Sequence, residues 1–168
     1  MLMDVKAPDN LSPYCLSVAS ALEMGQQRII NAIKDLGPEL LAATVPGLTN
    51  SIATLVVHTC GTEVGAAYML RGTPLPADLA AEYLLDKPRS PLPVAVGESV
   101  DTLLEKMRRA RALLLEALST ISEQDADRQL DFHAGRQVTV RWVISLLPHH
   151  QGQHLGQIQC IKKLLVQS

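Results

Sequence analysis

Four long segments of the chain carry apolar residues at the spacing of an α-helix, and this pattern limits the fold more than any other feature. The segments cover about residues 12–36, 51–71, 97–121 and 139–166. In each of them apolar side chains recur every three or four positions, which places them on one face of a helix. Four such faces are buried most simply by packing side by side, so the sequence predicts an all-α four-helix bundle.

Turn and capping residues separate the four predicted helices. Ser12 followed by Pro13 is a typical helix start, and Gly37-Pro38 ends the first helix. Thr49, Asn50 or Ser51 can cap the second helix. Residues 72–93 contain five prolines, so we expect a long crossover between helices two and three, with a short helix near residues 77–85. A crossover of this length joins parallel helices, and long loops also cover binding sites.

Two further features concern the end of the chain. Residues 123–137 are polar and include His133 beside Gly135, so this segment is expected to be a loop with His133 on the surface. Pro148 lies inside the fourth helix. Because proline removes one hydrogen bond of the helix, a kink is expected immediately before His150.

The composition supports a helical protein with one core. Hydrophobic residues make up 47% of the 168 residues and aromatic residues only 3%, so the interior must consist of Leu, Ile, Val and Ala, which suits packed helices. A chain of this length needs no second core, and residues 1–168 are expected to form a single four-helix-bundle domain.

Charge and hydropathy exclude two classes of partner. The net charge is -2 with acidic and basic residues interspersed, which offers no basic surface for nucleic acid. No run approaches the roughly 18 apolar residues of a membrane span, and the N-terminus lacks the apolar core of a signal peptide. We therefore expect no membrane partner and a cytoplasmic protein.

Cys15, Cys60 and Cys160 lack CxxC spacing and are expected to be small buried hydrophobic residues.

Three of the five histidines lie within six positions, at residues 149, 150 and 154. His150 and His154 are four residues apart, so both can point to one place from one face of the fourth helix. That face is otherwise apolar, and unpartnered imidazoles there would be costly. His149 is about 100° away around the helix and is expected to flank this pair. The pair is half of a metal site.

His58 is the third candidate ligand. It lies in the second helix, on a face with small and hydroxyl-bearing residues such as Thr62 and Gly65, which predicts a cavity with hydrogen-bonding walls. In a four-helix bundle His58, His150 and His154 can converge. Three neutral imidazoles with one open coordination position suit Zn²⁺ or Ni²⁺.

The spacing of His150 and His154 matches the HxxxH helix of zinc proteases, but Gln151 stands where those enzymes have a glutamate base. An amide cannot accept a proton from metal-bound water. Glu63 and Asp101 are other candidate bases, without a spacing argument. Gln157 and Thr62 can each orient a histidine or serve packing, whereas Cys60 faces away from His58.

Three arginines of the third helix, Arg108, Arg109 and Arg111, fall at its polar positions. They are expected to form a solvated face. The alternative is that one or two of them lie near the mouth of the site and hold an anionic group of a substrate.

Two stretches resemble the DinB/YfiT-like superfamily of metal-binding four-helix bundles. Residues 51–58 (SIATLVVH) are similar to the capped second helix that leads into the family's first histidine. Residues 139–158, with HQGQHLGQI, are similar to its closing helix. The resemblance implies that His58, His150 and His154 are metal ligands, that the metal is Zn²⁺ or Ni²⁺, and that the protein is a homodimer. Family members with assigned activities include S-transferases and isomerases that use bacillithiol, mycothiol or glutathione.

The main functional hypothesis is a metal-dependent S-transferase, in which a low-molecular-weight thiol binds at the open metal position and attacks an electrophilic substrate. A metal-dependent hydrolase is one alternative. A non-catalytic, stress-related metal-binding bundle is the other, so whether the protein is an enzyme stays open at the level of the sequence.

Overall fold

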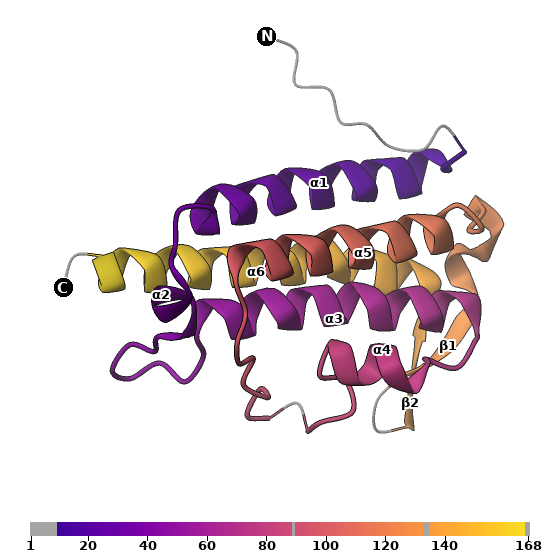
Figure 1. Ribbon diagram of the computed structural model, residues 1–168. Helices are drawn as coiled ribbons and strands as arrows, with labels where there is room; N and C mark the ends of the chain where they lie inside the picture. The colour runs from indigo at the N-terminus through magenta and orange to yellow at the C-terminus, as the bar shows by residue number, and fades with distance from the viewer. Residues whose placement is uncertain (1–9, 89, 133–134, 167–168) are drawn as a thin grey trace, which may run out of the picture.

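The computed structural model describes residues 10–88, 90–132 and 135–166 (Figure 1). Four long helices lie side by side: α1 (Pro13–Ile33), α3 (Ile52–Arg71), α5 (Val100–Leu118) and α6 (Val140–Val166). The predicted all-α four-helix architecture is confirmed. His133, expected on the surface of a loop, lies outside the described residues.

The long crossover joins two parallel helices, as its length indicated. In Figure 1, α3 and α5 run in the same direction and α1 and α6 run in the opposite direction. The chain returns from the end of α3 to the start of α5 through residues 72–99, which include the short helix α4 (Ala77–Glu82). This topology places α3 and α6, the two helices with the candidate ligands, next to each other.

Helix α3 is the central element of the fold. Its residues are buried on nearly every side, because α5, α6, α2 and the crossover all surround it, as expected for a helix that is apolar all round. Gly61 permits a close approach of the crossover. A Cβ atom at Gly61 would lie 3.0 Å from the carbonyl oxygen of Tyr83 and 3.1 Å from Cδ2 of Leu85, so a larger residue would push these segments apart.

Serine and threonine side chains fix where the helices begin. The hydroxyl of Ser12 accepts from the backbone N–H of Cys15, and the hydroxyl of Ser51 accepts from that of Thr54. Ser99 forms a capping box with Thr102 at the start of α5. These contacts satisfy backbone donors that the first turn of a helix leaves unpaired.

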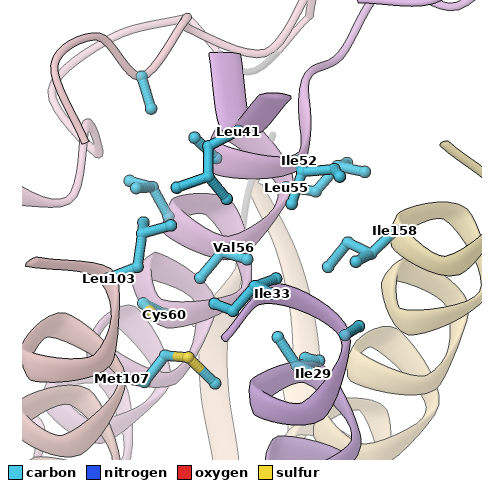
Figure 2. Packing of buried hydrophobic residues seen from close by; sticks show 14 of the residues in the cluster. Ile29, Ile33, Leu41, Ile52, Leu55, Val56, Cys60, Leu103, Met107 and Ile158 are labelled. Atoms are coloured by element: carbon cyan, nitrogen blue, oxygen red, sulfur yellow. The ribbon is translucent and has the colours of Figure 1, made fainter. Parts of the chain in front are cut away.

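Aliphatic side chains from all four long helices and α2 (Pro38–Ala42) form the core shown in Figure 2. Ile29 and Ile33 of α1, Val56 of α3 and Leu103 of α5 are fully buried there. Ile158 enters from α6, four residues after His154. The packing of α6 against α3 therefore continues directly from the core to the histidines.

The described residues of the segment 123–137 include regular secondary structure, so the prediction of a loop was wrong. It contains a 3₁₀ helix, η1 (Glu123–Asp127), and an antiparallel hairpin of β1 (Gln129–Phe132) and β2 (Arg136–Thr139). Leu130 pairs with Val138, and both pack onto the bundle. The polar composition concealed an alternation in which only every second residue of β1 faces the core.

Two smaller features complete the comparison with the sequence. Helix α2 was not predicted, because Pro38 was interpreted only as the end of the first helix, although proline is also favoured in a first helical turn. Helix α6 continues through Pro148, and the kink expected there stays a prediction. Within the described residues, every helix is too short or too polar to cross a membrane.

Candidate metal centre

His58, His150 and His154 come together between α3 and α6, as the sequence predicted. The Nε2 atom of His150 lies 3.0 Å from Nε2 of His58 and 3.1 Å from Nε2 of His154. The ring centroids are 4.4 to 4.9 Å apart, and the rings are tilted or edge-on to one another. His154 is buried, and His58 and His150 are half-buried. Three imidazoles thus direct ring nitrogens toward one small region.

Gln157 fixes the orientation of His154. The Nδ1 atom of His154 lies 2.7 Å from Oε1 of Gln157, which is an acceptor, so Nδ1 carries the proton and Nε2 presents a lone pair. Burial lowers the pKa of His154, and the hydrogen bond to Gln157 opposes this shift only in part. The imidazole is therefore neutral at neutral pH, which is the form that binds metals.

Two of the three nitrogen–nitrogen distances are close to those of a tetrahedral metal site. At Zn–N bonds of about 2.0–2.1 Å, two tetrahedral ligands lie roughly 3.3 Å apart. The three histidines offer ligand atoms within 4.8 Å of one another, and the two closest pairs would need to open by only a few tenths of an ångström. His58, His150 and His154 could hold one metal ion and leave its fourth position open.

A cavity of about 410 Å³ borders the histidines. Its walls come from one face each of α3 and α6, from the segment after α3 and from β1. Besides His58 and His150, they consist of Thr62, Gly65, Ala66, Tyr68, Met69, Thr73, Leu75, Phe132, Val143, Leu146 and Leu147. The predicted cavity beside His58 is present. Its walls are mainly apolar, which corrects the expectation of hydrogen-bonding walls.

The comparisons with known proteins identify the family. A model of the DinB superfamily matches residues 21–158, a span that contains all three histidines. The chain belongs to the DinB superfamily. A search of the curated proteins found none that matches it. Among solved structures it is similar to the crystal structure of a conserved protein from Enterococcus faecalis, with a TM-score of 0.74 and 18% identity over 91% of this chain and 97% of that one. This likeness supports the fold.

Glu63 is not a candidate base in this DinB-superfamily chain. Its carboxylate forms a buried bidentate ion pair with Arg111, at 2.9 Å to Nε and 2.8 Å to Nη2. Asp101 is exposed on α5. Among the described residues, the only group of histidine, cysteine, aspartate or glutamate side chains that converges as a metal site is the three histidines.

Arg111 contradicts the prediction of a solvated arginine face on α5. It is 5% exposed, because α5 packs against α3 and α1 at this point. Gln151, next to His150, also contacts Arg111. In the amide orientation that forms both hydrogen bonds, the Gln151 nitrogen donates to the carbonyl of Leu22 and its oxygen accepts from Arg111. Arg108 and Arg109 are exposed as predicted and pair with Glu105 and Glu82. None of the three arginines lines the cavity.

The crossover covers the other side of His58. Tyr83, Leu84, Leu85 and Pro93 lie with His58 around a very small second cavity of about 10 Å³. The hydroxyl of Tyr83 donates to the carbonyl of Lys106 and holds the crossover against α5. Water therefore has little room on this side, and the larger cavity is the roomier approach to the histidines.

The other residues that the sequence offered as possible site residues lie outside the set of three histidines. His149 is exposed and Cys60 is buried in the core, so neither joins the three histidines. The hydroxyl of Thr62 donates to the backbone carbonyl of His58. Sequence reasoning missed the cavity residues Leu75 and Phe132, because they come from segments expected to be irregular and no helical spacing relates them to His58.

Proposed function

We propose that this DinB-superfamily protein is a metal-dependent S-transferase that joins a low-molecular-weight thiol to an electrophilic co-substrate. The observation that carries the proposal is the convergence of three imidazoles beside a cavity that can hold a second molecule. His58, His150 and His154 would hold one Zn²⁺ or Ni²⁺ ion. All three are neutral ligands, so the charge of the ion is left for an anionic fourth ligand such as a thiolate.

When bound, the metal ion supplies positive charge that lowers the pKa of a thiol at its open position. The reaction forms a bond between the thiol sulfur and the electrophilic carbon. The leaving group departs with the electron pair of its bond to that carbon, and the thiol proton is released to water. The thiol thus becomes a thioether, and no oxidant or reductant is required.

The chain's own residues have three roles in this proposal. Gln157 accepts the Nδ1 proton of His154 in a hydrogen bond and keeps the Nε2 lone pair directed at the ion. The crossover residues around Tyr83 exclude water on one side of His58. The larger cavity holds the electrophile close to His58 and His150.

The hydrolase alternative lacks a base in the described part of the chain. Hydrolysis at a metal needs a group that removes a proton from water. Glu63 is paired with Arg111, Asp101 is exposed on α5, and Gln151 is an amide within the Arg111 network. A thiol transferase needs no such base, because the thiolate is already the nucleophile.

We propose further that the protein forms a homodimer. Gly152 and Gly156 lie exposed on one side of α6, and added Cβ atoms at these positions would meet nothing within 4 Å. Small residues on an exposed helix face allow a second helix to approach closely. Light scattering at micromolar concentration should give twice the mass of the chain, and a monomer would contradict the proposal.

Cobalt substitution tests the transferase directly. The Co²⁺-loaded protein would be titrated with bacillithiol, mycothiol and glutathione while the visible and near-ultraviolet spectrum is recorded. At least one thiol should produce a sulfur-to-metal charge-transfer band, and the glutathione analogue with serine in place of cysteine should produce none. If no thiol changes the metal spectrum at millimolar concentration, the protein is not a transferase of this kind, and non-catalytic metal binding explains the site.

A further inference from the structure

We infer that the cavity beside His58 and His150 binds an uncharged, largely apolar organic molecule, and that this molecule is the electrophilic partner of the thiol. The second half of the inference rests on the proposed transferase function. The first half rests on the cavity alone, whose volume of about 410 Å³ lies in the usual range for small-molecule sites.

The walls of the cavity are apolar over most of their extent. Met69 of α3, Leu146 of α6, Leu75 and Phe132 represent the four segments that enclose it. The hydroxyl-bearing residues of the wall are Tyr68 and two threonines, one of which, Thr62, already donates its hydroxyl to the carbonyl of His58. The site therefore offers a large apolar contact area and few polar groups to orient a ligand.

No aspartate, glutamate, lysine or arginine lines the cavity among the residues that the structure describes. Two arginines outside the lining are near it. The guanidinium of Arg136 is 5.9 Å from the ring centroid of Phe132. Arg71 is close as well, with its guanidinium 5.7 Å from the ring centroid of Tyr68. Its charge is directed elsewhere, since it donates to the carbonyl of Leu113 and pairs with Glu116 at 2.9 Å. In the metal-free protein, a charged ligand group among these walls would lose its hydration and meet no lysine or arginine in the described lining of the cavity.

The lack of charged residues in the cavity wall favours the electrophile over the thiol as the occupant of the cavity. Low-molecular-weight thiols of the glutathione type carry carboxylate and ammonium groups, which the apolar walls disfavour. An uncharged electrophile has no such penalty and gains from burial of its apolar surface. Because His58 and His150 belong both to the cavity wall and to the set of three histidines, a molecule in the cavity lies directly beside the thiol site.

Gly65 keeps the cavity open. It lies on α3 two turns after His58, and a Cβ atom at this position would meet nothing within 4 Å. A glycine inside a helix costs about 0.5–1 kcal/mol relative to alanine. The open space beside it means that a larger side chain would extend into the cavity without displacing a neighbour. Gly65 is thus the position at which the cavity can be filled with least effect on the fold.

The first experiment measures binding to the metal-free protein. The probe is N-phenyl-1-naphthylamine, an uncharged fluorescent molecule, and its matched control is 8-anilino-1-naphthalenesulfonate, which has the same rings plus one negative charge. The uncharged probe should bind at about one molecule per chain and at least about tenfold more tightly than the sulfonate, since the cavity offers no cation. Equal affinity for the two probes would overturn the inference.

The second experiment fills the cavity. Gly65→Leu should weaken binding of the uncharged probe by about tenfold or more, because the added side chain takes the volume that the ligand occupies. Ala112→Leu adds the same side chain at an exposed position of α5 outside the cavity, and its affinity should equal that of the wild type. Metal content should be the same in all three proteins. Wild-type probe affinity in Gly65→Leu would place the probe elsewhere and overturn the assignment.

The third experiment separates the cavity from the transferase. Metal-loaded protein would be tested for conjugation of thiols to 1-chloro-2,4-dinitrobenzene and to the anionic 4-chloro-3,5-dinitrobenzoate, each rate divided by the uncatalysed rate. Catalysis should favour the uncharged compound and be lost in Gly65→Leu. Catalysis that favours the anionic compound would overturn the inference of an uncharged occupant and leave the proposed transferase function standing. Probe binding without any thiol conjugation would overturn the transferase, and with it the occupant's role as an electrophile.

Discussion

Arg111 and Glu63 form a bidentate ion pair in the interior of the bundle, with side chains that are 6% and 8% exposed. The same guanidinium donates to the carbonyl of Leu22 and to the carboxylate of Glu23. One side chain of α5 therefore connects to α3 and to two consecutive residues of α1. Removing one partner from a buried pair leaves the other charge uncompensated.

Glu63→Gln should destabilise the protein strongly. We expect a loss of roughly 3–5 kcal/mol in the free energy of unfolding, as is typical when a buried ion pair is broken. Urea denaturation followed by circular dichroism measures this loss. Glu105→Gln removes the exposed partner of Arg108 and should leave the unfolding midpoint unchanged. Similar midpoints for both variants would contradict the structural role of the Arg111–Glu63 pair.

Gly25→Ala should also destabilise the protein, although alanine is the better helix former. A Cβ atom at Gly25 would overlap the amide of Gln151, which is buried against Arg111 and Leu22. Gly65→Ala is the matched control, because this glycine inside α3 has nothing within 4 Å of its Cβ position, and it should gain about 0.5–1 kcal/mol. A higher thermal midpoint for Gly25→Ala would refute the close contact.

Gln157→Ala should weaken metal binding by roughly tenfold or more, the usual effect of removing a group that orients a histidine ligand. Without the Oε1 acceptor, His154 can move its proton to Nε2 and lose the lone pair that faces the site. Competition with a chromophoric chelator gives the affinities. Gln157→Glu keeps an acceptor and should restore binding, and Gln153→Ala, at an exposed position of α6, should have no effect. Unchanged affinity in Gln157→Ala would show that the tautomer is fixed by another contact.

The three cysteines should differ in reactivity toward thiol reagents. Burial raises the pKa of Cys15 and of Cys60, so their thiolates are scarce as well as inaccessible. Cys160, which was expected to be buried, is instead exposed on α6. Native protein should react rapidly with 5,5′-dithiobis(2-nitrobenzoic acid) at one thiol per chain, and unfolded protein at three. Cys160→Ser should abolish the fast phase. Rapid reaction of a second thiol would mean that α1 or α3 is less well packed than described.

The sequence was informative where one residue decides a local property. Ser12 marked the start of the first helix, and Ser51 was one of three candidate caps of the second, because a side-chain oxygen there can satisfy an unpaired N–H of the first turn. His150 and His154 could be assigned to one face because four residues nearly complete a helical turn. Convergence with His58 then required only that the two helices be neighbours.

The features that the sequence concealed depend on contacts between distant segments. Arg111 occupies a polar position of its own helix, and nothing within that helix reveals that Glu63, 48 residues earlier, faces it. Phe132 reaches the cavity only because β1 pairs with β2, which follows Gly135, whose φ of 70° suits glycine. Strand pairing of this kind depends on tertiary contacts, which the local composition does not determine.

Metal analysis of histidine variants tests the central claim most directly. Wild-type protein purified without chelators should contain about one divalent transition metal per chain, because three histidines on two helices complete the ligand set. His58→Ala, His150→Ala and His154→Ala should each lose most of it, while His149→Ala, at the exposed neighbouring position, should retain it. Circular dichroism would confirm that all four variants fold. Wild-type metal content in the folded His150→Ala and His154→Ala proteins would contradict the account.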